Sequence, residues 1–409
     1  MASPWMSRRR SRGAVSRRYG FRFGWSSAGA FGTFDGRQIV YRTGKGAPAE
    51  SAAATWLGMR PNRHRPAPLA LAIGGNVREN LRYCVILPAY NEGRHLTTVV
   101  GRIPDWVSGI IIVDDASTDD TLTVAESLTD TRCRVEHHEK NSGVGGAMVT
   151  GFRAALDGGF DVAIKIDADD QMDVRELPIL VRPIQLGMAE YVKGNRFRRT
   201  GRPSSMPRRR WLGNVVLSFL TKVASGYWHV FDPQCGFIAI TTPTLRRLKL
   251  DGIARDYFFE NDMLIRLNVI DARVVDVDTS SLYGDETSYL SVGRASWTFP
   301  PRLLRGFFWR FIRRHLMNDF GLIGLLSTIG FAFTLFGSLF GLYHWILSAS
   351  TGVTATTGTV MVAVVPVILG VQMLLQGLSL EVQSSAGASE TREYARIGYT
   401  VGNPPADVS

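Results

Sequence analysis

Two long apolar segments near the C-terminal end of the sequence place the strongest constraint on how this chain can fold. Residues 321–347 contain no Asp, Glu, Lys or Arg over 27 positions, and residues 359–380 contain none over 22. As helices that rise about 1.5 Å per residue, both segments can cross a hydrocarbon layer about 30 Å thick. Buried helices of soluble proteins rarely run so far without a charge, although a pair of core helices stays open as the alternative. The sequence therefore predicts two transmembrane helices.

The charges that flank these segments predict their orientation. The connecting loop, residues 348–358, has no charged residue. The stretch before the first segment contains five arginines: Arg302, Arg305, Arg310, Arg313 and Arg314. Because loops rich in Lys and Arg stay in the cytosol, both ends of the hairpin and the domain that precedes it are expected on the cytosolic side. We therefore expect a multi-pass integral membrane protein.

Residues 291–318 form a basic juxtamembrane region with an amphipathic pattern. Leu304, Phe307, Phe308 and Phe311 follow an i, i+3, i+4, i+7 spacing, which places them on one face of a helix with arginines on much of the rest. Beside a membrane span, such a helix is expected to lie in the interface plane, attracted to anionic headgroups. A surface helix packed on the globular domain is the alternative.

The first 80 residues form a basic segment without sustained helical or strand periodicity. They hold 14 basic and three acidic residues, while the remaining 329 residues hold 33 of each. We expect this segment to be mostly disordered. Three widely spaced cysteines, Cys84, Cys133 and Cys235, argue against a disulfide scaffold and a structural zinc site.

Between residues 81 and 290, short apolar runs alternate with helical patterns. The runs rich in Val and Ile span residues 83–88, 109–115, 133–138 and 161–167, and the helical patterns span residues 92–100, 119–128 and 146–156. This alternation predicts a parallel sheet with right-handed crossovers, so the expected fold class is α/β, a Rossmann-like open sheet. A helix at 211–224 and strands at 236–241 and 272–278 are expected to complete the domain, in an order that the pattern leaves open.

Polar residues follow each of the four predicted strands. Pro88 to Glu92 follow the first strand, Asp114 and Asp115 the second, residues 140–143 the third, and Asp167 to Gln171 the fourth. Helix capping and turns explain some of these residues one at a time. In open parallel sheets, however, ligands bind outside the carboxyl ends of the strands. The four ends together therefore predict a ligand site.

Asp167 and Asp169 indicate which ligand this site takes. They alternate by two at a strand end, so both carboxylates can lie on one side and hold Mg²⁺ or Mn²⁺. A divalent ion there could bridge a diphosphate and neutralise it as a leaving group. The pattern GxxxxGK[ST] is absent, and the first strand leads into PAYNEG rather than GxGxxG. P-loop nucleotide hydrolases and nicotinamide dehydrogenases are therefore disfavoured.

Five sequence blocks resemble one known family. VILPAYNE (85–92), VDDASTDDT (113–121), KNSGVGGA (140–147), DADDQ (167–171) and DPQCGF (232–237) are, in this order and spacing, similar to glycosyltransferase family 2. Within it, they resemble the polyprenyl-phosphate glycosyltransferases that include the dolichol-phosphate mannose synthases. The resemblance covers about residues 82–280, and the span pair is similar to that of bacterial and archaeal membrane-anchored members. It implies a GT-A type fold for residues 81–290, and a location in the plasma or inner membrane of a prokaryote.

The resemblance assigns roles on the donor side of the site. It implies that Pro88, Tyr90 and Glu92 line the nucleotide pocket and that Asp115 holds the base or ribose. It also implies that Asp167, Asp169 and Gln171 bind the metal. Asp167 would also contact the bound nucleotide, and Asp169 would be catalytic.

On the acceptor side, Arg196 in GNRF matches an element that contacts the acceptor phosphate, and it is the second residue to which the resemblance gives a catalytic role. Asp232, Gln234, Cys235 and Gly236 match the floor of the acceptor site. The segment FENDML, residues 259–264, stands where many family 2 enzymes place a general base. Whether Glu260 or Asp262 takes that role is left open.

We expect an inverting glycosyltransferase that moves a sugar, such as glucose or mannose, from a nucleotide-sugar to dolichyl or undecaprenyl phosphate at the cytosolic membrane face. A lipid phosphate has a second pKa of about 6, so at neutral pH it is largely a dianion that needs no general base. The expected cofactor is Mg²⁺ or Mn²⁺, and the expected partners are the two substrates and the bilayer, with no nucleic acid. Cell envelope glycan biosynthesis is the expected setting.

Two other functions stay open. A family 2 enzyme that acts on a hydroxyl of a glycan or glycolipid would need a base in residues 259–262. The second is a non-catalytic protein, either a membrane scaffold or a basic protein whose N-terminal arm binds nucleic acid or lipid. A homo-oligomer also stays open, because Gln372 and Gln376 could hydrogen-bond across a helix interface or within the hairpin. Residues 382–409 are expected to form a flexible tail.

Overall fold

Two compact units make up the chain, residues 1–67 and residues 68–409. The computed structural model describes residues 32–35, 38–41, 78, 80–196, 208–279 and 292–401. In the first unit, β1 (Gly32–Asp35) and β2 (Gln38–Tyr41) pair as an antiparallel ladder. The sequence analysis does not predict this pair, because it finds no strand periodicity in the basic segment.

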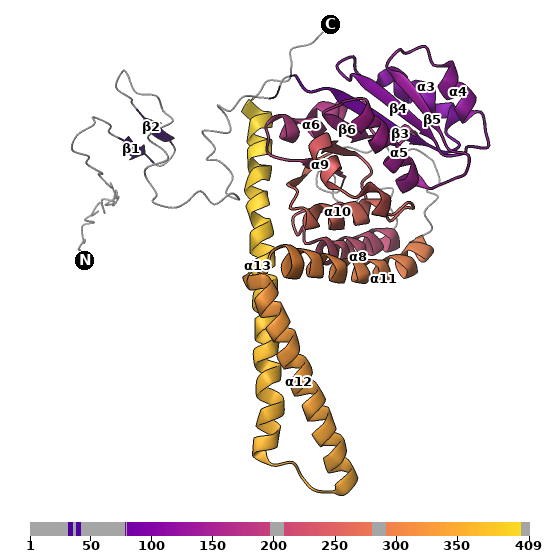
Figure 1. Ribbon diagram of the computed structural model, residues 1–409. Coiled ribbons are helices and arrows are strands. Elements are labelled where there is room, and N and C mark those ends of the chain that lie inside the picture. The colour runs from indigo at the N-terminus through magenta and orange to yellow at the C-terminus, as the bar shows by residue number, and fades with distance from the viewer. Residues whose placement is uncertain are drawn as a thin grey trace, which may run out of the picture. The chain divides into compact units, whose positions relative to one another are not determined.

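One seven-stranded sheet forms the centre of the described part of the second unit (Figure 1). Its strands are β3 (Tyr83–Ala89), β4 (Gly109–Asp114), β5 (Cys133–His137), β6 (Val162–Lys165), β7 (Tyr191–Asn195), β8 (Ile238–Thr241) and β9 (Val274–Asp278). Their spatial order is β5-β4-β3-β6-β8-β7-β9. The first four are parallel, as predicted, whereas β8 runs antiparallel to β6 and β7. The α/β class is confirmed, as a mixed sheet.

The sequence analysis misses β7, which lies between β8 and β9. Three of its five residues are Lys193, Gly194 and Asn195, and all five are buried. Polar residues inside a buried strand remove the apolar run by which a strand is recognised. The same strand leads directly to Arg196, so its polar residues lie beside the predicted acceptor site.

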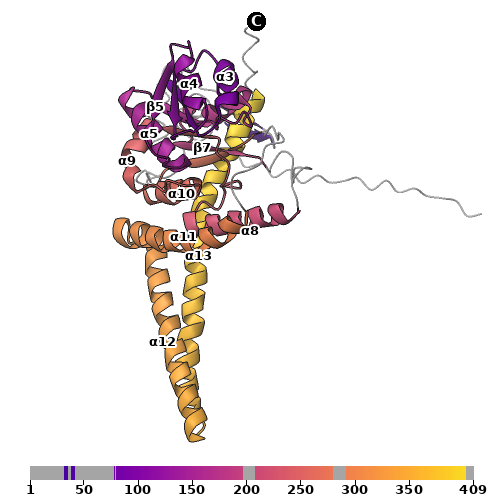
Figure 2. The same ribbon diagram turned by 90° about the vertical axis from the view of Figure 1, so that its right-hand side faces the viewer.

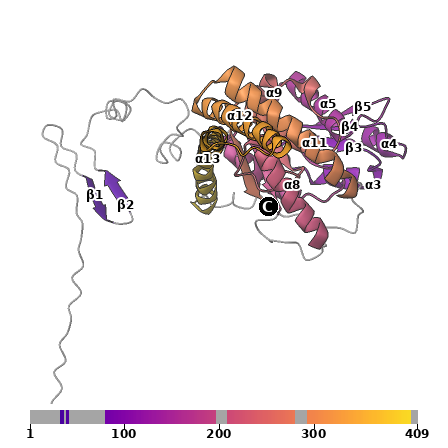
Figure 3. The same cartoon turned by 90° about the horizontal axis from the view of Figure 1, so that it is seen from below.

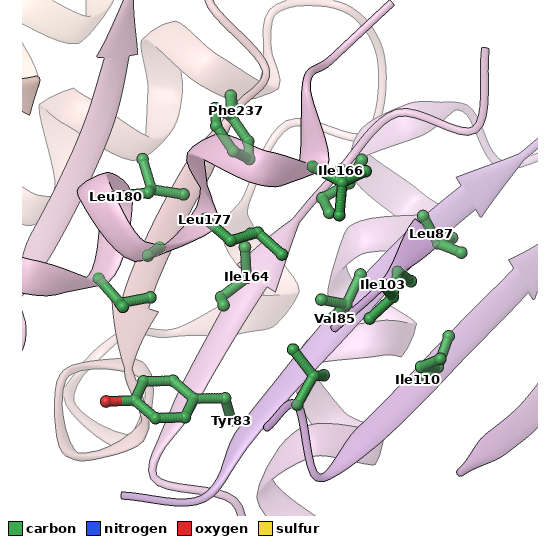
Figure 4. Packing of buried hydrophobic residues seen from close by; sticks show 14 of the residues in the cluster. Tyr83, Val85, Leu87, Ile103, Ile110, Ile164, Ile166, Leu177, Leu180 and Phe237 are labelled. Carbon is green, nitrogen blue, oxygen red and sulfur yellow. The ribbon is translucent and has the colours of Figure 1, made fainter. Parts of the chain in front are cut away.

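Helices cover both faces of the sheet, because alternate residues of each strand point to opposite sides. Tyr83, Val85 and Leu87 of β3 pack with α3 (Gly93–Arg102) and α6 (Leu177–Gln185), as Figure 4 shows. Cys84 and Ile86 pack on the other face with α5 (Val144–Asp157), α9 (Thr242–Arg247) and α10 (Phe259–Val269). Burial on both faces explains why these strands are continuous apolar runs. The short elements α4 (Thr121–Ser127), η1 (Val174–Glu176) and η2 (Leu250–Gly252) complete the domain.

Two further helices, α8 (Arg208–Ser225) and α11 (Val292–Phe311), lie side by side next to α10 (Figures 1 and 3). A small separate core joins them to the segment around α10, made of Ala224, Phe258, Ile265, Phe299 and Leu303. These helices therefore form an additional layer on the α10 side of the sheet.

The apolar face predicted for α11 is divided between two environments. Leu304 and Phe308 are 59% and 53% exposed, but Phe307 packs against the small core of α8, α10 and α11. Arg310, one of the arginines of this basic region, is fully buried. One side of α11 packs on α8 and α10, in keeping with the alternative of a helix packed on the domain, while Leu304 and Phe308 face outward.

The apolar hairpin predicted from the sequence is formed by α12 (Leu322–Thr351) and the first part of α13 (Thr357–Val401), which extend away from the sheet (Figure 2). Leu322–Thr351 and Thr357–Ser385 are long and apolar enough to cross a membrane. Only 17% and 6% of their most apolar windows are buried, which disfavours the alternative of core helices. The π-helical turn η3 (Ile312–Asn318) joins α11 to this hairpin.

Helix α13 continues past the apolar segment to Val401 and contacts β9. The sequence analysis ends the second span at residue 380 and expects a flexible tail from residue 382. Residues 381–401 contain several good helix formers and no proline, so nothing in their sequence stops the helix. Glu381 and Ser385 also bond to the folded domain, which favours helix in this stretch.

Candidate functional site

The loops after β3 and β4 are bound to each other through hydrogen bonds. The Asn91 amide donates to Ser117 Oγ (3.0 Å), and Asn91 Oδ1 accepts from the Thr118 amide (2.8 Å). Asn91 and Ala116 both have a φ of 59°, a left-handed conformation that a side chain adopts at some cost. These contacts join two neighbouring strand ends into one braced wall of the site.

The predicted nucleotide-pocket residues Pro88, Tyr90 and Glu92 lie along this wall. Tyr90 is 43% exposed, and Pro88 and Glu92 are partly exposed, so all three are accessible at the carboxyl end of β3. The Glu92 amide donates to Thr121 Oγ1 at 2.9 Å, which ties the start of α3 to the start of α4. The placement fits the predicted pocket.

Asp115, predicted to hold the base or ribose, is 3% exposed and already engaged by the third strand-end loop. Its Oδ1 accepts from the Ser142 amide (2.8 Å) and its Oδ2 from the Gly143 amide (2.7 Å). His138 Nδ1 lies 2.7 Å from Asp115 Oδ1. Asp115 therefore fixes the loop at residues 140–143 in the structure, whatever else it contacts.

Asp114, which the sequence analysis places at the same strand end as Asp115, pairs with a histidine of β5. Asp114 is fully buried, and its Oδ2 lies 2.8 Å from His137 Nδ1. Its other oxygen, Oδ1, is buried without a hydrogen-bond partner among the described residues. The consecutive histidines and consecutive aspartates thus pair one to one across β4 and β5, a pattern visible in the sequence only once those strands are known to be neighbours.

Asp167 lies just beyond β6, beside a buried lysine. Lys165 Nζ is 2.5 Å from Asp167 Oδ1 and 3.5 Å from Glu260 Oε1 of α10. Gly236 faces this pair: a Cβ there would lie 2.6 Å from Asp167 Oδ2 and closer still to Lys165 Nζ. The DADDQ and DPQCGF blocks therefore meet at Gly236, where an added side chain would force the Lys165 ammonium or the Asp167 carboxylate to move.

Asp169 and Gln171 form the turn that follows Asp167. Asp169 Oδ1 accepts from the Gln171 amide at 3.1 Å. The residue between them, Asp170, has a φ of 57° and pairs with Arg102 at 2.6 Å. The carboxylates of Asp167 and Asp169 thus stand near the carboxyl end of β6, as predicted, while that of Asp170 is committed to an ion pair with α3.

On the predicted acceptor side, Arg196 and Asp232 form a bidentate ion pair. Arg196 Nε and Nη2 lie 2.7 and 3.2 Å from the two Asp232 oxygens, and the Asp232 side chain is 1% exposed. Gln234 donates from Nε2 to Asn261 Oδ1 on α10 (2.8 Å). The structure brings Arg196 and Asp232 together as the resemblance implies, and directs Gln234 toward α10.

The structure separates the two carboxylates of the FENDML segment. Glu260 is 8% exposed and faces Lys165. Asp262 Oδ2 accepts from the Ala254 amide (2.8 Å) and from Arg266 Nε (2.7 Å). Asp262 therefore stabilises the start of α10, and only Glu260 reaches the site.

Two fully buried lysines, Lys165 and Lys193, contact candidate site residues, and the sequence analysis does not single them out. Both pair in register with Ile238 of β8, one from each side, so they flank the same strand. Burial lowers the pKa of Lys165, but the carboxylates of Asp167 and Glu260 outweigh it and raise that pKa above its usual value. Burial lowers the pKa of Lys193, which donates to the Cys235 carbonyl. A lysine within an apolar run was the available signal.

The donor set of this site fits a hard divalent cation. Asp167 and Asp169 supply carboxylates and Gln171 an amide oxygen, and oxygen ligands of this kind suit Mg²⁺ or Mn²⁺. Among the described residues, no cluster of three or more His, Cys, Asp and Glu side chains could hold a metal ion. The remaining ligands would therefore be water and substrate phosphate, which is how proteins commonly hold Mg²⁺.

Comparison with known proteins identifies relatives of the sheet domain. The sequence profile described as Glycosyl transferase family 2 matches residues 84–248. UDP-N-acetylglucosamine–dolichyl-phosphate N-acetylglucosaminyltransferase from Methanococcus voltae is 31% identical over 214 residues, 49% of this chain and 85% of the relative. Undecaprenyl-phosphate mannosyltransferase from Micrococcus luteus is 33% identical over 202 residues, 48% of this chain and 82% of the relative.

Among solved structures, glucosyl-3-phosphoglycerate synthase from Mycobacterium tuberculosis, in complex with Mn²⁺, UDP and its product, superposes with a TM-score of 0.44. The sequences are 22% identical, and the match covers 60% of this chain and 85% of the synthase. A superposition of this quality carries no inference about the ligands of this chain.

Proposed function

The chain belongs to glycosyltransferase family 2, and from that membership we propose that it transfers a sugar from a nucleotide-sugar to a polyprenyl phosphate at the cytosolic face of a membrane. Relatives named for transfer to dolichyl phosphate and to undecaprenyl phosphate, each matched over most of its length, support this acceptor class. The two apolar helices support a membrane-bound acceptor.

The pairing of Glu260 and Asp262 with cationic side chains is the observation that carries the proposal. Glu260 faces the ammonium of Lys165, and Asp262 is held by the Ala254 amide and Arg266. Both carboxylates are thus committed to cationic side chains of the protein itself. An acceptor that already carries negative charge needs no proton removed, so a phosphate suits this site better than a hydroxyl.

The reaction would follow from how these residues hold the two substrates. A phosphate oxygen of the acceptor attacks the anomeric carbon, the bond from that carbon to the nucleoside diphosphate breaks, and the electron pair leaves with the diphosphate, which inverts the anomeric configuration. Arg196, oriented by Asp232, would aim the acceptor phosphate. A metal ion on Asp167, Asp169 and Gln171 would neutralise the departing diphosphate. Lys165 would keep Asp167 in place.

On the donor side, Pro88, Tyr90 and Glu92 would form the pocket for the nucleotide. Asp115, through the Ser142 and Gly143 amides, would shape the neighbouring loop and contact the base or ribose. Specificity for one sugar or one base would arise from the shape of this pocket rather than from a single residue.

The membrane-facing side would be formed by α8, α11 and the hairpin. Val216 and Phe219 of α8 are 51% and 57% exposed, and Leu304 and Phe308 of α11 are similarly exposed. Exposed apolar side chains on helices beside membrane spans are typical of helices that lie in the interface. The exposed Arg305 and Arg313 would meet anionic headgroups, which supports a cytosolic location for the domain.

Replacement of Asp169 by Asn tests the proposal. We expect Asp169→Asn to reduce transfer of labelled sugar to polyprenyl phosphate by at least about 100-fold, because loss of a metal ligand removes charge stabilisation of the leaving group. Asp170→Asn is the matched control, since it alters the adjacent carboxylate, which pairs with Arg102, and should leave transfer within about twofold. Equal activity of the two variants would refute the metal assignment.

A hydroxyl acceptor is the second candidate, because Glu260 does reach the site. In that case Glu260→Gln would lower transfer by about 100-fold or more and remove the acidic limb of the residual pH–rate profile, which reports ionisation of a general base. Our proposal predicts instead a pH profile of unchanged shape with a moderately lower rate. The pH dependence of transfer by wild type and Glu260→Gln, measured side by side, separates the two.

A further inference from the structure

Helix α13 bonds directly to the chain segment that leads to the acceptor residues. Glu381, the first charged residue after the second apolar segment, pairs with Arg310 of α11. Arg310 is fully buried and also donates to the Ala224 and Val223 carbonyls at the end of α8 (2.8 and 3.2 Å). A buried guanidinium with this many acceptors fixes the positions of the helices that supply them.

Gly226, the first residue after α8, lies against the ion pair between Arg310 and Glu381. Gly226 has a φ of 73°, and a Cβ there would lie 2.7 Å from Arg310 Nη1 and 3.0 Å from Glu381 Oε1. Both the backbone conformation and the close approach require glycine. Segment 226–232, which ends at Asp232, therefore begins in contact with α13.

One helical turn further along α13, Ser385 holds the same segment. Ser385 Oγ accepts from the Trp228 amide (3.2 Å) and lies 2.9 Å from His229 Nδ1. His229 Nε2 is 2.8 Å from the Val274 carbonyl of β9, so Nε2 carries the proton and Nδ1 accepts from the serine hydroxyl. His229 thus connects α13 to the edge of the sheet.

The far end of the segment is fixed by β9 beside the acceptor pair. The Phe231 amide donates to Asp276 Oδ2 (3.1 Å), and Asn195 Nδ2 donates to the same oxygen (2.9 Å). Asp232 follows Phe231 and Arg196 follows Asn195, and these two residues form an ion pair with each other. Contacts therefore run without a gap from α13 to the Arg196–Asp232 pair.

We infer that α13 acts as a strut that positions the acceptor site relative to the membrane, with Glu381 and Ser385 as positioning residues for the acceptor but not for the donor. The inference rests on the proposed function, which assigns the acceptor to Arg196 and Asp232. A continuous helix is rigid over this length, so the depth of the span in the bilayer sets the height of segment 226–232. The predicted donor residues follow β3, β4 and β6, whereas α13 contacts β9 at the edge of the sheet beyond β8 and β7.

The test measures donor and acceptor kinetics separately in the full-length protein reconstituted with undecaprenyl phosphate. Ser385→Ala removes both hydrogen bonds to the segment, and we expect it to raise the KM for the lipid phosphate about fivefold or more, as loss of about 1 kcal/mol predicts. The KM for the nucleotide-sugar and the melting temperature should stay at the wild-type values. Ser385→Thr keeps the hydroxyl and should restore the acceptor KM.

Ser384→Ala is the matched control, because the exposed Ser384 hydroxyl donates only to the Glu381 carbonyl of its own helix. It should leave both constants unchanged. Glu381→Gln, which keeps the size of the side chain but weakens its bond to Arg310, is the second variant and should act in the same direction as Ser385→Ala.

Two results would overturn the inference while leaving the proposed function intact. One is a wild-type acceptor KM in both Ser385→Ala and Glu381→Gln. The other is an equal rise in both KM values with a lower melting temperature, which would indicate general destabilisation. Absence of any lipid-linked product from the wild-type protein would instead remove the proposed function, and this inference with it.

Discussion

Lys165 places a fully buried positive charge between two carboxylates at the centre of the site. Its ammonium contacts Asp167 and faces Glu260, and the absence of a side chain at Gly236 leaves room for it. A buried charge is stable only where partners compensate the cost of desolvation. This arrangement accounts for the glycine at position 236 and pairs Glu260 with a buried cation.

Gly236→Ala tests this reading of the site. The added methyl group would lie 2.6 Å from Asp167 Oδ2, so Asp167 and Lys165 must move. We expect transfer to fall by about 100-fold, as misplacement of a catalytic group by about 1 Å predicts, with a loss of stability of about 1–3 kcal/mol. Gly101→Ala, at a position with nothing within 4 Å, is the control and should keep full activity. Activity assays and thermal unfolding of both variants decide the matter.

At this scale, the sequence predicts residues at strand ends well and their partners poorly. Asp167 and Asp169 lie where the strand pattern indicates, whereas the ion pair between Arg196 and Asp232 is not predicted. Lys165 and Lys193 escape notice because a lysine in an apolar run has no pattern of its own. Contacts between elements distant in the sequence decide which polar groups are paired, and no local signal carries that information.

At the scale of elements, apolar periodicity locates the parallel strands β3 to β6 and both long apolar helices. It misses β7, because Lys193 and Asn195 interrupt the apolar run, and α10, where FENDML mixes buried polar and apolar residues. It also ends α13 too early, since the loss of apolar character at Glu381 marks the end of the lipid-facing segment and not the end of the helix.

Gly337→Ala tests how the two helices of the hairpin pack. A Cβ at this position would lie 2.5 Å from the Ala363 carbonyl oxygen and 2.8 Å from Val367 Cγ2. We expect a loss of about 1–3 kcal/mol, because overpacking forces the helices apart. At Gly341 the nearest atom is the Ala363 Cβ at 3.3 Å, so Gly341→Ala should be close to neutral. Thermal stability in detergent that is the same for both variants would contradict the close approach at Gly337.

At the scale of the whole molecule, every proposed site residue belongs to the unit at residues 68–409. That unit combines a sheet domain of glycosyltransferase family 2 with a hairpin of two apolar helices and a layer, α8 and α11, that presents apolar side chains outward. A nucleotide-sugar is soluble and a polyprenyl phosphate is not. Under the proposed function, the active site must be held near the headgroups, and this combination of elements would provide that placement.

Transfer of radiolabelled sugar into an organic-extractable lipid tests the central claim most directly. The purified protein would be supplied with polyprenyl phosphate, a panel of nucleotide-sugars and Mg²⁺ or Mn²⁺. The account predicts a labelled lipid with at least one donor, and no label when EDTA removes the metal. A protein that binds nucleotide but labels no lipid with any donor would contradict it.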